Sequence, residues 1–318
     1  FILPSKRAGG FLLNELKKNS PTTIFAPTIY SIEEFIEELS NLKIINNTEL
    51  LFKSYEAYLK TDSITEKEDF ETYSTWATTL LNDFNEIDRY LVEPTRFFSY
   101  LASIKTLERW GVKEEKTELI NNYLQFWESL PAFYENIQSF LLKEQIGYQG
   151  MVYREASANI EHYITANKNK TPFFIGFNAL NTAEQHIIQE LLETETTMVY
   201  WDADRTFYED SKHSASHFIR KYIKEWKYFQ QKTPKFIAQN YEKPKNFQFI
   251  EVQKNIGQAK YVGELLSTLS DDEINKTAVV LGDENLLVPL LYSLPENVKN
   301  LNLTMGVPLK QFPAVVFF

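Results

Sequence analysis

The spacing of hydrophobic and polar residues is typical of an α/β protein at the start of the chain. Residues 1–5 form a short apolar run that ends at a proline and a serine, and residues 6–18 place apolar positions at helical spacing. A second β-rich run covers 22–31, and Ser31 is followed three residues later by Glu34, which is a capping-box pattern for a helix start. The order strand, helix, strand, helix predicts a parallel sheet.

The pattern changes between residues 33 and 170. Successive segments there are amphipathic with a period of about 3.6 residues and are rich in Phe, Tyr, Trp and Leu. Strand-like alternation of polar and apolar residues is absent from this part of the sequence. The segment is therefore predicted to be an all-helical insertion whose aromatic residues form a helix-bundle core.

Strand signals return after the insertion. Apolar β-rich runs at 171–180 and 196–204 flank a helical segment, and a polar stretch with two prolines at 233–246 is interpreted as a linker. Beyond the linker the order strand, helix, strand begins again, with strands expected at 246–253 and 276–283. A second α/β unit is therefore predicted.

These changes of pattern divide the chain into three predicted parts. Residues 1–32 together with 171–235 form a first α/β domain, and residues 33–170 form the helical insertion. Residues 245–318 form the start of a second α/β domain. Both ends of the chain lie in apolar runs, so the chain is interpreted as an internal piece of a longer protein.

The composition excludes several kinds of chemistry. The chain contains no cysteine, which removes disulfides and thiolate sites and is compatible with a cytoplasmic location. His213 and His217 lie four residues apart on an expected helix, but no third ligand is suggested nearby, so a solvated helix face is favoured over a metal site. No apolar run approaches the ~20 residues that cross a membrane. We expect no metal, no membrane contact and no bound cofactor.

The net charge of −10 argues against a broad nucleic-acid-binding surface, which needs clustered Lys and Arg. The charge is uneven, because residues 61–170 hold 18 acidic and 11 basic residues. Most of the acidity therefore belongs to the helical insertion, and the α/β parts remain able to carry a basic groove.

A phosphate-binding loop of the GxxxxGK[ST] type is absent from the sequence. Gly9 and Gly10 are the only adjacent glycines, and they follow an expected strand but lack the lysine that would contact phosphate. A packing role at the helix start is favoured for this pair.

The order of the α/β segments resembles that of superfamily 1 helicases of the UvrD/Rep/RecB type. Five stretches correspond in sequence order to conserved stretches of that family, and they are residues 1–12, 28–39, 172–185, 200–208 and 278–291. The helical insertion lies where those helicases carry a helical subdomain. The resemblance implies a P-loop-NTPase-like, RecA-like parallel sheet, followed by the start of a second RecA-like unit.

The sequence departs from the helicase pattern at the residues that carry hydrolysis. Gly176 and Phe177 stand where the family has the Asp that holds Mg²⁺ and the Glu that positions the attacking water. Arg205 replaces a sensor Gln, and Gly282 replaces an Arg that would stabilise phosphate charge. The resemblance therefore implies a degenerate core with no catalytic residues.

A narrower resemblance is to the inactivated helicase half of AddB/RecC-type proteins, in their Bacteroidetes-type form. It is carried by phrases such as LPSKRAGGFL, PTIYSIEEFIEEL, FFIGFNAL and VVLGDENLLVPLLYSLP. The resemblance implies a PD-(D/E)XK nuclease domain downstream of this chain. It also implies a role in processing DNA double-strand breaks beside an active helicase-nuclease subunit.

Two groups of residues are candidates for DNA contact. By resemblance, Lys6 and Arg7 would touch DNA phosphate, with an ordinary solvated turn as the alternative. Tyr30 and Ser31 occupy the second DNA-contact position, where Tyr30 would stack on a base or would instead be a half-buried core residue.

A basic stripe on the helix expected at 212–232 is the second candidate. It consists of Arg220, Lys221, Lys224 and Lys227, interleaved with aromatic residues. A basic face laid over the core is the favoured alternative. Asp202 and Asp204 resemble a metal pair, although a leftover structural carboxylate is favoured.

Three functions follow from the sequence. The first is a catalytically inactive helicase-like scaffold that binds DNA or docks an active helicase subunit during end processing. The second is a residual nucleotide-binding switch or weak ATPase, for which an upstream phosphate loop would be the evidence. The third is a purely structural interaction module, which the net acidity supports.

Overall fold

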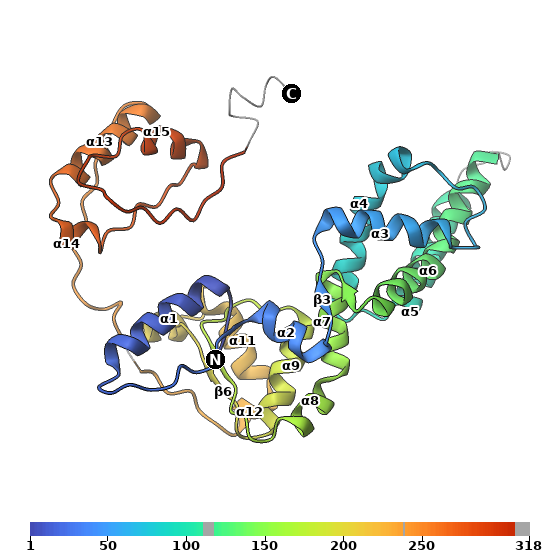
Figure 1. Cartoon of the computed structure of the whole chain (residues 1–318), viewed down its shortest axis with the longest axis horizontal. Helices are drawn as coiled ribbons and strands as arrows, with labels where there is room; N and C mark the ends of the chain where they lie inside the picture. The colour runs from blue at the N-terminus through green and yellow to red at the C-terminus, as the bar shows by residue number, and fades with distance from the viewer. Residues whose placement is uncertain (111–117, 238, 309–318) are drawn as a thin grey trace. The chain divides into compact units, whose positions relative to one another are not determined.

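The computed structural model describes residues 1–110, 118–237 and 239–308. The chain divides into two compact units, Phe1–Glu242 and Lys243–Phe318 (Figure 1). Helices predominate, and one four-stranded parallel sheet lies in the first unit, so the α/β class predicted from the sequence is confirmed. In the described part of the chain, no helix has both the length and the apolarity needed to cross a membrane.

The first unit contains short strands and longer helices. The strands are β1 (Ile2–Leu3), β2 (Tyr30–Ser31), β3 (Lys43–Ile44), β4 (Ile146–Gly147), β5 (Phe173–Ile175) and β6 (Met198–Tyr200). The helices are α1 (Lys6–Asn19), α2 (Ile32–Ser40), α3 (Asn47–Leu59), α4 (Phe70–Arg89), α5 (Pro94–Trp110), α6 (Glu118–Lys143), α7 (Gln149–Ala158), α8 (Ile160–Ala166), α9 (Thr182–Glu193), α10 (Arg205–Glu209), α11 (His217–Glu225) and α12 (Lys227–Gln230).

The main sheet has the strand order β2-β1-β5-β6, and every neighbouring pair is parallel. Ile2 is the central residue, because it lies opposite Tyr30 on one side and Phe174 on the other. The chain leaves the sheet after β2 and returns at β5, beside β1. The helical insertion thus separates strands that are close neighbours in space.

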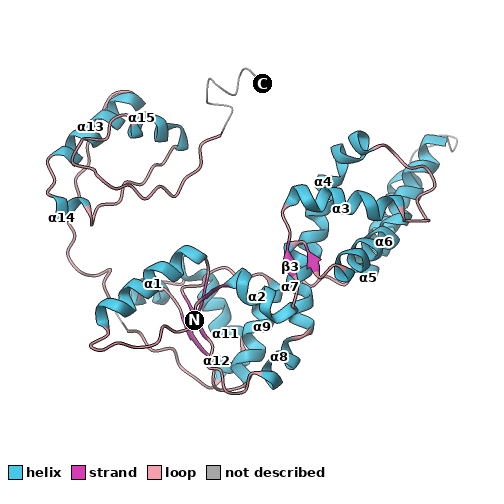
Figure 2. Ribbon diagram, in the orientation of Figure 1, coloured by secondary structure: helices cyan, strands magenta, loops and turns pink. Residues whose placement is uncertain are grey.

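The helices of the first unit surround two separate hydrophobic cores. One core lies against the sheet and joins Ile2, Phe35 and Phe174 to apolar residues of α7, α8, α9 and α11. The other lies among α3, α4, α5 and α6 and is strongly aromatic, with Tyr73, Phe84 and Phe133 buried. Figure 2 shows the small β3–β4 sheet at the base of this second, helical part.

The boundaries of the helical insertion differ from the expected 33–170. Helices α2 and α8 pack on the sheet core and α7 contributes to both cores, so the residues of the separate helical core extend only from Leu50 to Met151. The range also contains the parallel pair of β3 and β4, so it is not entirely helical. An amphipathic period identifies a helix with an apolar face, but it does not identify which core that face meets.

Helices α4 and α7 connect the two cores through a close approach at Gly150. A Cβ atom on Gly150 would lie only 2.1 Å from the backbone oxygen of Asn85, so no larger residue fits there. The Gly150 backbone N–H also donates to the Asn85 side chain at 2.6 Å. The two helices are therefore in direct backbone contact at Gly150 and Asn85.

A buried carboxylate is the centre of the same region. Asp88 is fully buried and accepts hydrogen bonds from the Tyr134 hydroxyl, the Tyr148 hydroxyl at 2.5 Å and the Gln138 amide at 2.9 Å. Arg154 Nε forms an ion pair with it at 2.5 Å. One side chain of α4 thus links α6 and α7.

The second unit contains α13 (Asn255–Ser267), α14 (Asp271–Ile274) and α15 (Leu287–Leu291) within its described residues. The strands expected at 246–253 and 276–283 are not strands there. Phe247, Phe249 and Val280 are instead exposed. An apolar β-rich run becomes a strand only when a neighbouring strand receives its hydrogen bonds, and these runs have none in the described structure.

Candidate nucleic-acid interface

The structure brings the four predicted contact residues of the first α/β segment to one end of the sheet. β1 and β2 are parallel, with Leu3 opposite Ser31, so the residues that follow both strands lie at the same sheet edge. Lys6 and Arg7 begin α1, while Tyr30 and Ser31 form β2. We call Lys6, Arg7, Tyr30 and Ser31 the strand-end surface. In parallel α/β sheets this carboxyl edge is where ligands bind.

Ser31 contributes to the local fold of this surface. It is only 4% exposed, and its hydroxyl accepts the Glu34 backbone N–H at 3.3 Å. The Glu34 carboxylate in turn accepts the Ser31 backbone N–H at 2.9 Å, which completes the capping box that the sequence predicts. The Ser31 side chain is thus occupied by the start of α2.

Glu34 also restrains the first cation of the strand-end surface. The Lys6 ammonium group forms an ion pair with Glu34 at 3.0 Å. This contact raises the pKa of Lys6, whereas the Ser31 backbone N–H and then Lys6 lower the pKa of Glu34. Lys6 is therefore partly neutralised by a residue whose position the sequence identified only as a helix cap.

Tyr30 is half-buried and packs against the core. Its ring lies 6.4 Å from the ring of Phe35. A hydrogen bond to Glu38, and then burial, raise the pKa of Tyr30 to about 12. Tyr30 is therefore anchored by packing against the sheet core.

Arg7 is the residue of this surface that is best placed to meet phosphate. It is exposed, and among the described residues it has no hydrogen-bond or ionic partner. It lies in the first turn of α1, where the Ser5 side chain accepts the Ala8 backbone N–H at 3.3 Å. The positive end of the helix dipole adds to the guanidinium charge there.

The basic stripe is interrupted in the structure. The expected single helix is broken at Trp226, between α11 and α12. Arg220 is used internally, since its guanidinium donates to the backbone oxygens of Phe207 at 2.7 Å and His213 at 2.5 Å. It fastens α11 to the α10 loop.

Two of the three stripe lysines have acidic partners. Lys221 lies 4.0 Å from Glu225, and Lys227 forms an ion pair with Glu193 at 3.1 Å. Lys224 is exposed. Lys224 is thus the stripe cation without an acidic or backbone partner among the described residues, as Arg7 is in the strand-end surface.

The carboxyl end of β5 carries no acidic side chain. Gly176 has a φ of +79° and donates its N–H to Tyr200 at 2.9 Å, so the backbone there adopts the left-handed region that favours glycine. Phe177 is 5% exposed and packs on Phe174 inside the core. Neither residue can ligate a cation or accept a proton.

Arg205 and Gly282 are the other two positions at which the sequence departs from the helicase pattern. Arg205 pairs with Glu209 at 2.6 Å on the surface of α10. Gly282 is exposed in the second unit, with open space where a Cβ would be. Within the described ranges, no group of three or more His, Asp or Glu side chains could hold a metal ion.

Asp204 has a structural role in the described part of the chain. The sequence favoured such a role over metal binding but did not identify the hydrogen-bond partners. Its carboxylate accepts backbone N–H groups of Thr206 at 3.1 Å, Asn240 at 2.8 Å and Tyr241 at 2.9 Å. These bonds, first of all the one from Tyr241, lower the pKa of Asp204. The carboxylate thus fastens the segment after α12 to the end of β6.

The histidine pair is likewise part of the local fold. His213 Nδ1 accepts the Ala215 backbone N–H at 3.1 Å in the turn before α11, and His217 begins that helix. A ring nitrogen used in this way is not directed toward a shared metal ion.

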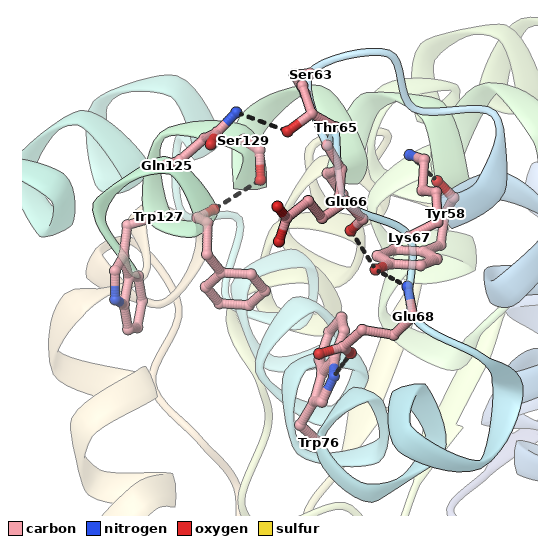
Figure 3. A pocket seen from close by; sticks show the side chains of 12 residues that line it. Tyr58, Ser63, Thr65, Glu66, Lys67, Glu68, Trp76, Gln125, Trp127 and Ser129 are labelled. Atoms are coloured by element: carbon pink, nitrogen blue, oxygen red, sulfur yellow. Dashed lines mark hydrogen bonds between the residues drawn. The ribbon is translucent and has the colours of Figure 1, made fainter. Parts of the chain in front are cut away.

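A pocket of about 590 Å³ lies in the helical part, between the loop before α4 and the α4 and α6 helices (Figure 3). Several of its polar groups form hydrogen bonds within the protein. Lys67 donates to the Tyr58 backbone oxygen at 2.7 Å, and the Trp76 indole donates to Glu68 at 2.7 Å. These hydrogen bonds hold the loop between α3 and α4 in place, so the polar lining of the pocket is explained by the local fold.

Replacing Gly176 with alanine is expected to lower the free energy of unfolding by about 1–2 kcal/mol, because an L side chain is strained at this positive φ. Gly10→Ala is the matched control, since Gly10 lies inside α1 with open space around its Cβ position. That control should be neutral or stabilise the protein by up to ~1 kcal/mol. Urea unfolding monitored by circular dichroism measures the stability of both variants. Equal losses of stability in Gly176→Ala and Gly10→Ala would contradict the explanation from the positive φ of Gly176.

Comparison with known proteins adds no identification to this geometry. No protein-family model matches the chain, and no curated protein matches it.

Proposed function

We propose that this chain is a catalytically inactive, helicase-like scaffold that binds DNA during the processing of double-strand breaks. The observation that carries the proposal is the end of β5, where Gly176 has a φ of +79° and Phe177 is buried. In a helicase these two positions would supply the Mg²⁺ ligand and the catalytic carboxylate. A chain with this backbone and these side chains lacks the carboxylates that ATP hydrolysis needs, and the proposed activity that remains is binding of DNA.

The proposed fold is a degenerate RecA-like core. Its support is a parallel sheet whose central strands β1 and β5 come from distant parts of the sequence, with a helical subdomain inserted between β2 and β5. The second unit would be the start of a second RecA-like domain. The proposed partner is an active helicase-nuclease subunit, as the resemblance to AddB/RecC-type proteins implies.

Arg7 provides the sharpest test of DNA binding. Arg7→Ala is expected to weaken binding of a single-stranded oligonucleotide and to reduce the slope of log affinity against log salt by about 1, because one phosphate contact is lost. Fluorescence anisotropy over a range of salt concentrations measures both quantities. The control is Lys17→Ala, which removes one charge from the exposed, opposite end of α1.

Two results would contradict this function. One is the absence of any salt-dependent affinity for DNA, which would favour the interaction-module hypothesis. The other is ATP turnover above background or a clear rise in melting temperature with ATP, which would favour the nucleotide switch. If Arg7→Ala and Lys17→Ala weaken oligonucleotide binding equally, the strand-end surface is not the DNA-binding site.

A further inference from the structure

The helical part of the first unit contains an apolar groove outside the strand-end surface. The groove has a volume of about 850 Å³, within the range of protein ligand sites, and it lies between α4, α5 and α6. Its deepest residues are Phe84, Phe98 and Leu130, each no more than 3% exposed. We call this feature the α4–α6 groove.

The groove follows one face of α4. Lining residues extend along that helix from Thr75 to Tyr90, which corresponds to about 22 Å at 1.5 Å per residue. Ring contacts fix the other two helices against this face, with Trp76 lying 5.3 Å from Phe126 of α6 and Phe84 lying 5.8 Å from Phe98 of α5. The opening is therefore elongated along α4.

Large apolar side chains remain exposed at one end of the groove. Tyr90 is 50% exposed, and Val92 and Phe97 are each 37% exposed. Contiguous apolar surface of this kind marks an interaction site in soluble proteins. An elongated groove between helices, lined with aromatic rings, suits a further helix whose side chains interdigitate with those of α4 and α5.

The charged residues of the groove define the occupant further. Among the described residues that line it, the two charged side chains are Asp83 and Glu86, and both are acidic. Glu86 is paired with Arg89 at 3.0 Å, whereas Asp83 has no hydrogen-bond or ionic partner among the described residues. Asp83 is exposed at the rim of the groove, so its carboxylate is accessible to a cation of a partner.

We propose that the α4–α6 groove is a docking site for an amphipathic helix of a protein partner, with apolar residues along one face and an Arg or Lys placed opposite Asp83. Complementarity of charge and shape carries this assignment. The described lining contains no basic side chain to contact phosphate, so this site is separate from the strand-end surface and does not depend on DNA binding.

The probe is a synthetic peptide of about 18 residues, which spans ~27 Å as a helix, with Leu at helical spacing and Arg along the flanks of that face. Two comparison peptides have the same length: one carries Glu in place of Arg, and the other is a scrambled sequence without an apolar face. Fluorescence anisotropy of the labelled peptide on the whole chain measures affinity. The basic peptide is expected to bind about tenfold or more tightly than the acidic one.

Asp83→Lys should weaken binding of the basic peptide by about tenfold and improve binding of the acidic peptide. The matched control is Glu135→Lys, a charge reversal on the exposed face of α6 outside the groove, which should leave both affinities unchanged. Oligonucleotide binding should be the same in both variants, which separates this site from the proposed function.

Several results would overturn the proposal. They are equal binding of basic and acidic peptides, equal effects of Asp83→Lys and Glu135→Lys, or equal binding of the scrambled peptide. Concentration-dependent dimerisation that Asp83→Lys abolishes would assign the groove to a second copy of the chain instead. Binding of a small apolar dye without any peptide binding would identify it as a ligand pocket.

Discussion

Asp88→Ala is expected to lower the free energy of unfolding of the first unit by about 3–5 kcal/mol. The carboxylate is fully buried, and its loss would leave the Arg154 guanidinium without its ionic partner and two tyrosine hydroxyls without their acceptor. Few single substitutions have effects of this size, which approach the whole stability of a small domain. Urea unfolding followed by circular dichroism measures the change.

The surrounding residues provide the controls for this prediction. Glu135→Ala removes an exposed carboxylate from α6 and should change stability by no more than about 0.5 kcal/mol. Arg154→Met in the Asp88→Ala background should recover part of the loss, because it removes the unpaired cation. A cost below about 1 kcal/mol for Asp88→Ala, or additive effects of the two substitutions, would show that the network is not coupled.

Alkaline unfolding is expected to be the second large effect. Burial raises the pKa of Tyr73, Tyr134, Tyr148 and Tyr153 above the ordinary tyrosine value. Because their pKa values are higher in the folded state than in the unfolded state, their contribution to stability is complete below pH ~10 and is lost as pH rises above it. Each tyrosine then costs ~1.4 kcal/mol per pH unit, so four together cost about 5 kcal/mol by pH ~11.

Such a loss is comparable to the total stability of many domains, so the first unit should unfold cooperatively between pH ~11 and ~12. Tyrosinate absorbance and far-ultraviolet circular dichroism, recorded on the same samples, test this. Ionisation of all tyrosines near pH ~10 with the helices intact would contradict the prediction.

Tyr73→Phe offers an independent check on the alkaline transition. The variant keeps the buried ring but removes one ionisable hydroxyl, which donates to Ser54 at 2.7 Å. It should lower stability at neutral pH by about 1 kcal/mol and yet reduce the steepness of the loss of stability above pH ~10. If the pH dependence of stability is unchanged in this variant, Tyr73 is not one of the tyrosines that cause the alkaline unfolding.

The predictions from sequence succeeded where the signal is local. The helical spacing of residues 6–18 corresponds to α1, and the capping box of Ser31 and Glu34 begins α2 as predicted. The apolar runs at 171–180 and 196–204 contain β5 and β6, although only three residues of each are strand. The predicted strands are too long because a β-rich composition does not show where the neighbouring strand ends.

The partners of the candidate DNA-contact residues were not evident from the sequence. Arg220 was predicted as part of a basic stripe, but it binds the backbone of residues 207 and 213 and is not available as a free cation. Lys6 is paired with Glu34, which follows β2 rather than β1. The Lys6–Glu34 pair forms only once the parallel strands align their carboxyl ends, and the Arg220 bonds form only once the chain turns back between α10 and α11.

The sequence by itself determined the α/β class, the presence of a helical insertion, and the absence of carboxylates at Gly176 and Phe177. Periodicity, capping residues and residue identity are properties of neighbouring positions, so they need no knowledge of the fold. Only the tertiary structure decided that α2, α7 and α8 cover the sheet, that Asp88 joins three helices, and that α4, α5 and α6 leave an open groove. Those features arise from contacts between distant segments, whose geometry is set by packing rather than by local preference.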